Sequence, residues 1–286
     1  MANILRGKEV ADKVTEELLE RVGRLTEKGI VPTLAVVRLG AREDDLSYER
    51  GALKRAEKAG VAVTVRALPE DIPQKALERE LESINRDASI HGCLLFRPLP
   101  KHLDEKRICD TLCPEKDMDG MTTGSMARVF TGLGPGFAPC TAEAAMAILK
   151  HYDIPIKGAR AVVIGRSLVI GKPVAMMLLK ENATVTMCHT RTVNLPEVTR
   201  EGDIIIACAG AAEMVTAGFV RPGQTIVDVG INFTEGGRLV GDVAFEEVEP
   251  VVAAITPVPS GVGSVTSAIL MRHVVEAAES RWPELP

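Results

Sequence analysis

The segment 160–173 holds the residues whose types and spacing most clearly predict chemistry. An apolar strand pattern, Arg160–Ile164, runs into a Gly-Arg-Ser turn, and a helix pattern begins a few residues later. Free N–H groups at the start of such a helix bind phosphate, and glycines let the backbone approach it. The spacing is G-R-S-x-x-x-G-x-P rather than G-x-G-x-x-G, so a purely structural turn is the alternative. We interpret the segment as a dinucleotide-binding turn with five cofactor-contacting residues: Gly165, Arg166, Ser167, Gly171 and Pro173.

The residues after the next strand pattern indicate which nicotinamide cofactor fits. That strand ends near Cys188, where an NAD site often carries a carboxylate for the ribose hydroxyls. His189, Thr190 and Arg191 follow instead. Because Arg191 and Arg166 could bind a 2′-phosphate, the sequence favours NADP, with NAD as the alternative. A solvated surface charge is the structural alternative for Arg191.

Composition and charge exclude several classes of protein. The chain has 286 residues, of which 46% are apolar and 26% charged, typical of a globular protein of about two domains. A net charge of −5 and an aromatic content of 3% provide neither a basic surface nor base-stacking rings, so we expect no nucleic-acid partner. No apolar run is long enough to span a bilayer, and the charged N-terminus lacks a signal-peptide core. We therefore expect a cytoplasmic protein with no membrane partner.

The six cysteines are scattered through apolar and helical contexts without the spacing of a disulfide framework. Cys109 and Cys113 are four positions apart and could share a helix face, but no nearby histidine completes a ligand set. We therefore expect reduced thiols and no metal.

The order of the hydrophobic patterns predicts an α/β fold with two domains. Strand patterns separated by helices of 10–15 residues indicate a parallel sheet. The Gly- and Pro-rich segment 131–141 is the best candidate for a hinge, and strand and helix patterns alternate again from 160 to 231. The expected helices are 8–28, 45–59, 73–87, 141–151 and 264–281, and the expected strands are 32–39, 61–68, 92–96, 160–164, 183–188, 203–209 and 225–231.

Five further motifs, together with the glycine turn, carry a resemblance to a known family. They are Lys116-Asp117-Met118-Asp119-Gly120, Pro139-Cys140-Thr141, Asp228-Val229-Gly230-Ile231-Asn232, Gly241-Asp242-Val243 and the segment 256–263. From about residue 4 to residue 280 the chain resembles the methylenetetrahydrofolate dehydrogenase/cyclohydrolase family (FolD type). So many motifs in one order make the resemblance highly specific.

The resemblance implies the architecture and the reaction. It implies a folate-binding, catalytic domain (1–140 plus 265–286) and a Rossmann-type NAD(P)-binding domain (141–264), with a cleft between them. It also implies a C-terminal helix that returns to the first domain, and a homodimer. It also implies hydride transfer from methylenetetrahydrofolate to NADP or NAD, which gives the methenyl compound. Bifunctional members then hydrolyse that compound to formyltetrahydrofolate. The site residues carried over are Tyr48 and Asp119 as catalytic residues that contact the substrate, Pro98 and Gly261 in the substrate pocket, and Thr190, Arg191 and Ile231 near the cofactor.

Two positions depart from the family's active-site pattern. The pattern Gly-x-x-Pro-Ala-Ser-x-x-Tyr-x-x-x-Lys places its tyrosine on Tyr48 but its lysine on Ala52. The pattern Val-Gln-Leu-Pro-Leu-Pro places its glutamine on Phe96, which either closes the pocket or belongs to the strand core. On a helix Lys54 points about 200° away from position 52. Arg55 lies closer, but a guanidinium stays protonated and is a poor base.

These two substitutions affect the two reactions differently. Hydride transfer depends mainly on positioning, whereas hydrolysis needs a group that deprotonates water, which usually contributes ~10²–10⁴-fold. We therefore expect a dehydrogenase with little or no cyclohydrolase activity, in a substrate pocket that includes Ala52 and Phe96. The bifunctional enzyme is the first alternative. A paralogue with an altered substrate, or a nucleotide-binding regulator, is the second.

Overall fold

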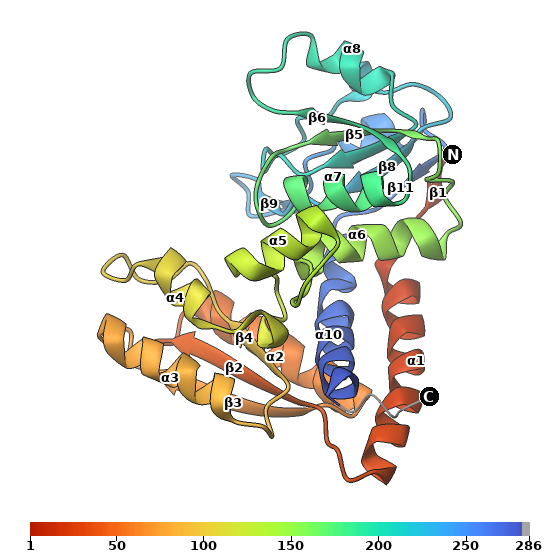
Figure 1. The fold of residues 1–286 in the computed structure, drawn as a ribbon. Helices are drawn as coiled ribbons and strands as arrows, with labels where there is room; N and C mark the ends of the chain where they lie inside the picture. Colours follow the sequence, from red (N-terminus) through yellow and green to blue (C-terminus); the bar gives the residue numbers. More distant parts are fainter. Residues whose placement is uncertain (282–286) are drawn as a thin grey trace. The chain divides into compact units, whose positions relative to one another are not determined.

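The computed structural model describes residues 1–281, which form two compact units (Figure 1). The three-stranded unit comprises residues 12–140 together with the residues from Ser267 onward. The six-stranded unit comprises residues 1–11 and 141–266. Each unit is named after its main sheet, and the expected α/β class is confirmed in both.

A parallel sheet in the order β3-β2-β4 forms the centre of the three-stranded unit. Its middle strand, β2 (Thr33–Leu39), lies between β3 (Ala62–Leu68) and β4 (Gly92–Leu95). The apolar residues of β2, Leu34–Val37 and Leu39, are all buried, as expected for a strand covered on both faces. Helix α3 (Gln74–Arg86) joins the same core through apolar side chains at helical spacing. These buried side chains are Leu77, Leu81 and Ile84.

The six-stranded unit is built on a fully parallel sheet in the order β1-β11-β8-β7-β5-β6. Its central strands β7 and β8 are buried throughout and consist mainly of Ile, Val and Ala, the composition typical of parallel sheets. A right-handed β-α-β connection through α7 (Gly171–Lys180) is the usual way to join such strands. The strands are β1 (Asn3–Ile4), β5 (Arg160–Ile164), β6 (Thr184–Cys188), β7 (Ile204–Ala207), β8 (Thr225–Asp228) and β11 (Ala254–Ile255).

The long helices agree with the sequence-based expectation to within two residues at each end. Their periodic apolar positions extend over several turns, which makes the pattern easy to recognise. Besides α3, they are α1 (Gly7–Glu27), α2 (Glu43–Ala59), α6 (Cys140–His151) and α10 (Thr266–Ser280). As expected, α10 belongs to the three-stranded unit.

Short elements were not predicted, because they contain too few residues to show a period. The expected strands 203–209 and 225–231 are also too long, since the chain leaves the sheet at Ala207 and at Asp228. Besides β1 and β11, the unpredicted elements are α4 (Glu105–Thr111), α5 (Thr123–Thr131), α8 (Leu195–Arg200), α9 (Phe245–Val248), the hairpin of β9 (Asn232–Phe233) and β10 (Leu239–Val240), and three 3₁₀ turns at Pro114–Lys116, Ala217–Phe219 and Val262–Ser264.

The first eleven residues lie in a different unit from the one expected. The sequence suggested a first domain of 1–140, but β1 pairs in parallel with β11 and so extends the sheet of the six-stranded unit. A two-residue strand carries no pattern that could reveal this pairing. The change of unit near residue 140 falls at the end of the segment 131–141 that was expected to be a hinge. Within residues 1–281, no helix has both the length and the apolarity to cross a bilayer.

A buried carboxylate shapes the turn between β4 and α5. Asp117 is fully buried, and its two oxygens accept hydrogen bonds from the backbone N–H groups of Met121 (3.1 Å) and Thr122 (2.7 Å). Thr122 then caps α5 by accepting from the N–H of Ser125. The turn therefore has a fixed shape, and it carries Asp119.

Replacing Asp117 by asparagine tests this role. An amide keeps one acceptor and turns its NH₂ toward a backbone N–H, so one buried donor loses its partner. We expect Asp117→Asn to lower the free energy of unfolding by about 1–3 kcal/mol in urea denaturation. Asp71→Asn at an exposed position is the control. Equal stability of the two variants would show that the turn does not depend on this carboxylate.

Candidate functional site

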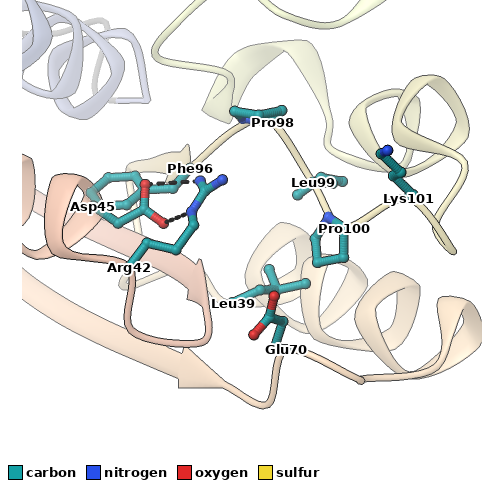
Figure 2. Close-up of a pocket in the computed structure, with 9 residues that line it drawn as sticks. All are labelled: Leu39, Arg42, Asp45, Glu70, Phe96, Pro98, Leu99, Pro100 and Lys101. Carbon is teal, nitrogen blue, oxygen red and sulfur yellow. Dashed lines mark hydrogen bonds and ion pairs between the residues drawn. The ribbon is translucent and has the colours of Figure 1, made fainter.

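Two adjoining cavities open in the three-stranded unit. The first, the Tyr48 cavity, measures about 350 Å³ and is lined by Asp44, Asp45 and Tyr48 of α2, by Leu94 and Leu95 of β4, and by Phe96, Arg97 and Asp119. The second, the Arg42 cavity, measures about 260 Å³ and shares Asp45 and Phe96 with the first (Figure 2). Its other lining residues are Leu39, Arg42, Glu70, Pro98, Leu99, Pro100 and Lys101. The structure thus brings Tyr48, Phe96, Pro98 and Asp119 to one region, whereas Ala52 and Gly261 line neither cavity.

Phe96 lies against Tyr48. The two ring centroids are 5.6 Å apart with an interplanar angle of 74°, an edge-to-face contact. Phe96 is buried, whereas Tyr48 is half exposed. Phe96 lines both cavities and packs against one side of the Tyr48 ring. The family pattern has a glutamine at position 96, which could hydrogen-bond but could not form this ring contact.

Asp119 is held from two sides. One of its oxygens accepts a hydrogen bond from the backbone N–H of Cys140 (3.3 Å), and the other lies 3.8 Å from Nη2 of Arg97. Burial raises the pKa of the Asp119 carboxyl, and the positive charge of Arg97 opposes this rise. The side chain thus combines an elevated pKa with access to a cavity, a combination typical of functional carboxyls.

The position that corresponds to the family's lysine does not line either cavity. Ala52 is 3% exposed and packs inside the unit. Arg55 donates to Oγ1 of Thr15 and lies 4.0 Å from Asp12, so its guanidinium is engaged elsewhere. Neither it nor Lys54 is among the residues that line the two cavities. Neither Lys54 nor Arg55 therefore brings a charge to the cavities.

Arg97 is a residue of the site that the sequence analysis missed. It lines the Tyr48 cavity between Asp119 and Glu105, whose Oε1 lies 3.9 Å from Nη1 of Arg97. The signal was present, because a charge at position 97 interrupts the apolar run Leu94–Leu99 where the family pattern has leucine. Asp44 and Asp45 line the same cavity and were given no role in the main interpretation, since acidic residues are common in the first turn of any helix.

In the six-stranded unit, the strand register brings the expected cofactor residues to one edge of the sheet. Ile164, at the end of β5, pairs with Cys188 of β6 and with Ala207 of β7. The glycine turn and the 189–194 loop therefore both start at the carboxyl edge, where α/β proteins bind ligands. Thr190 and Arg191 are exposed there, as are Arg166 and Ser167.

The glycine turn needs its glycines. Gly165 has φ = +142°, and a Cβ on it would clash with the carbonyl oxygen of Cys208. A Cβ on Gly171 would clash with the carbonyl oxygen of Gly165. Oγ of Ser167 accepts from the N–H groups of Ile170 (3.1 Å) and Gly171 (3.4 Å), so this side chain caps α7. Pro173 is buried in α7.

Two buried aspartates join the loops at the same edge. Asp242 is fully buried and accepts from the N–H groups of residues 209, 210 and 211 and from the side-chain amide of Asn232. Asp228 accepts from the N–H groups of residues 230, 242 and 243. Burial raises the pKa of Asp228 to about 7, although its three backbone donors favour the ionised form. Both aspartates stood in recognised motifs, but no role was assigned to them from the sequence.

A third cavity, of about 210 Å³, lies beside these loops. It is lined by Asp228–Ile231, Leu239 and Pro257–Ser264, so it includes two expected site residues, Ile231 and Gly261. Ile231 is exposed, and a Cβ on Gly261 would clash with the carbonyl oxygen of Pro257. Gly261 therefore belongs to a tight turn of the six-stranded unit. No group of three or more His, Cys, Asp or Glu within residues 1–281 is arranged to hold a metal ion.

Comparison with known proteins decides the family. Residues 5–119 match the catalytic domain, and residues 139–282 the NAD(P)-binding domain, of tetrahydrofolate dehydrogenase/cyclohydrolase. The chain belongs to this family. It is 53% identical over 281 residues, 98% of each chain, to the "Bifunctional protein FolD" of Carboxydothermus hydrogenoformans.

Solved structures agree with the assignment. The bifunctional FolD dehydrogenase/cyclohydrolase of Campylobacter jejuni is 40% identical with a TM-score of 0.95, over 98% of this chain and 100% of that one. The Trypanosoma brucei FolD, solved with NADP and an inhibitor, is 34% identical with a TM-score of 0.91 over 98% of both chains. The resemblance and the Rossmann-type NAD(P)-binding domain are therefore confirmed, and the chain is a folate-dependent oxidoreductase with a nicotinamide cofactor.

Replacing Gly165 tests the glycine turn. An alanine there would have to adopt φ = +142° and would meet the carbonyl oxygen of Cys208, so the turn must move. We expect Gly165→Ala to weaken NADP binding at least about tenfold in calorimetric titration. Gly158→Ala is the control, because its φ of +81° is also positive but no atom lies within 4 Å of its Cβ. Unchanged NADP affinity in Gly165→Ala would contradict a cofactor role for this turn.

The raised pKa of Asp228 predicts how stability depends on pH. The unfolded chain loses this proton near pH 4 and the folded chain near pH 7. Between these values the folded state binds more protons, so its stability falls as pH rises and levels off above about 7. From pH 5 to pH 8 we expect the free energy of unfolding in urea to fall by about 3 kcal/mol more in wild type than in Asp228→Asn. Glu235→Gln, at an exposed position, is the control. Equal losses would show that the backbone donors keep Asp228 ionised.

Proposed function

We propose that this chain is a bifunctional enzyme that oxidises 5,10-methylenetetrahydrofolate to 5,10-methenyltetrahydrofolate with NADP and hydrolyses the methenyl product to formyltetrahydrofolate. The observation that carries the proposal is the 53% identity, over 98% of both chains, to a protein named bifunctional. This supports the bifunctional alternative better than the expectation of little or no cyclohydrolase activity, which rested on Ala52 and Phe96 alone.

The Tyr48 cavity has the chemistry that a tetrahydropterin ring requires. The pterin presents N–H donors along one edge, and the Asp119 carboxylate can accept them. The ring of Tyr48, held by Phe96, offers an aromatic surface beside this acceptor. We therefore propose Tyr48 and Asp119 as residues that contact the substrate, with Phe96 and Pro98 in the pocket wall and Ala52 behind it. Gly261 stays a prediction for the substrate pocket.

The carboxyl edge of the six-stranded sheet fits a nicotinamide dinucleotide. Gly165 and Gly171 allow the turn to pack tightly against the backbone, and the N-terminus of α7 favours an anion. Arg166, Thr190 and Arg191 are exposed around it and suit a 2′-phosphate. The relative solved with NADP supports the choice of NADP. When bound, the cofactor accepts the hydride from the folate.

Hydrolysis needs a proton acceptor that the missing lysine does not supply. Water that adds to the methenyl carbon must lose a proton, and an arginine cannot take it. The Tyr48 cavity instead contains three carboxylates, of Asp44, Asp45 and Asp119. Because Asp119 faces the donor edge of the pterin in this proposal, Asp44 or Asp45 would take the proton.

A paired assay on the purified protein tests the proposal. Formation of methenyltetrahydrofolate from methylenetetrahydrofolate is followed with NADP and with NAD, and decay of added methenyltetrahydrofolate is compared with its decay in buffer. We expect hydride transfer with a preference for NADP, and a decay accelerated at least about 10²-fold.

Other outcomes would support the alternatives. Hydride transfer without accelerated decay would indicate a monofunctional dehydrogenase. No reaction in either assay would favour an altered substrate or a nucleotide-binding regulator, and calorimetry with NADP would separate these two. A homodimer and a cytoplasmic location stay predictions from the resemblance, and size-exclusion chromatography with light scattering tests the first.

A further inference from the structure

The charges of the Tyr48 cavity are unevenly divided. Of its eight lining residues, three are aspartates and one, Arg97, is an arginine. Arg42 lies in the adjoining cavity, and its guanidinium makes two hydrogen bonds to Asp45, of 2.7 and 3.0 Å (Figure 2). The charge of Arg42 is thus already matched, and Asp119 depends on Arg97 for a counterion.

The guanidinium of Arg97 lies between two carboxylates. Nη2 lies 3.8 Å from Asp119 and Nη1 lies 3.9 Å from Glu105. Glu105 is itself fixed, because its other oxygen accepts the backbone N–H of Leu99 at 2.8 Å. Both ends of the Arg97 guanidinium therefore lie near a carboxylate. The side chain is 24% exposed and lines the cavity. An arginine serving solubility alone would not be restrained in this way.

Two positions differ in charge from the family pattern. Where the family pattern has lysine on the helix and leucine after the strand, this chain has Ala52 on α2 and Arg97 after β4. The chain thus lacks the family's positive charge at position 52 and has one at position 97, which lines the Tyr48 cavity. The replacement is not chemically equivalent, since a guanidinium stays protonated and cannot act as a base.

We propose that Arg97 is a positioning residue of the folate site, which replaces the charge of the missing lysine and keeps Asp119 ionised and aimed at the substrate. This inference rests on the proposed folate function of the Tyr48 cavity. An ionised Asp119 can accept two hydrogen bonds from the donor edge of the pterin, whereas its protonated form retains one free acceptor. Arg97 therefore extends substrate binding to lower pH.

The groups around Asp119 act on its ionisation in both directions. Burial raises its pKa, and so does the negative charge of Asp117. The backbone N–H and the thiol of Cys140 favour the ionised form, as does Arg97, which is the largest of these favourable influences. The remaining titratable groups near it are Asp44, Asp45 and Tyr48 on α2, Glu105 on α4 and His273 on α10, which contacts Cys140. Removal of Arg97 leaves no other cation among the residues that line the cavity.

Three variants test the proposal on the full chain. Arg97→Leu introduces the residue of the family pattern, Arg97→Lys retains the charge, and Arg107→Leu is the control, because Arg107 pairs with Glu78 on the exposed surface. The readouts are the pH profile of kcat/KM for methylenetetrahydrofolate, the KM for NADP and the melting temperature.

In Arg97→Leu we expect the acidic limb of the kcat/KM profile to move up by about one pH unit. At pH values below that limb, the KM for the folate should rise about tenfold. The KM for NADP and the melting temperature should stay close to wild type. Arg97→Lys should restore most of the profile, and Arg107→Leu should match wild type. An acidic limb that stays in place would overturn the proposal. An equal rise in the KM for folate and for NADP, together with a lower melting temperature, would also overturn it and would indicate a structural role.

A measurement independent of activity separates this inference from the proposed function. The carboxyl of Asp119 is titrated by NMR in protein with ¹³C-labelled aspartate, and Asp119→Asn assigns its signal. We expect the midpoint to rise in Arg97→Leu and to return toward wild type in Arg97→Lys. An unchanged midpoint would overturn the proposal even in an active enzyme. A wild type inactive with folates but with the expected NMR shift would overturn the proposed function while leaving the Arg97–Asp119 pair established.

Discussion

The structure depends on how the backbone N–H groups are satisfied where parallel strands end. A strand that leaves the sheet exchanges its regular hydrogen bonds for loop geometry, and buried N–H groups left without partners would each cost about 1–3 kcal/mol. In both units, buried aspartates supply the missing acceptors. Asp117 does so for the turn that leads into α5, and Asp228 and Asp242 do so for the loops around β7 and β8. These loops carry two of the candidate site residues, Asp119 and Ile231.

This arrangement explains why the glycines of the motifs stand where they do. A Cβ on Gly230 would clash with the carboxylate of Asp242, and a Cβ on Gly241 would clash with that of Asp228. The Asp-Val-Gly and Gly-Asp-Val motifs therefore form one interlocked unit, in which each aspartate needs the glycine of the other motif. A binding edge built this way is preorganised, since its loops are fixed before any ligand arrives.

The sequence predicted the parts of the fold that repeat over many residues. Helix α3 is an example, because Leu77, Leu81 and Ile84 show the helical period within one segment. The parallel pairing of β1 with β11 could not be predicted, because the interacting residues are about 250 positions apart and each strand has two residues. The site divides in the same way: the motif residues Tyr48 and Asp119 were identified, but the Arg97–Asp119 pair exists only through tertiary contact.

The position of Arg97 also bears on how a chain without the family's lysine can resemble bifunctional relatives so closely. A lysine in such a cavity combines two properties, a positive charge and a proton that can be exchanged. In the proposed site the two are separated: Arg97 carries the charge, and a carboxylate of the same cavity would take the proton. Hydride transfer needs the positive charge to position the substrate, whereas hydrolysis needs both the charge and the exchangeable proton. The two reactions can therefore persist on different residues, provided that the charge and the proton acceptor stay within one cavity.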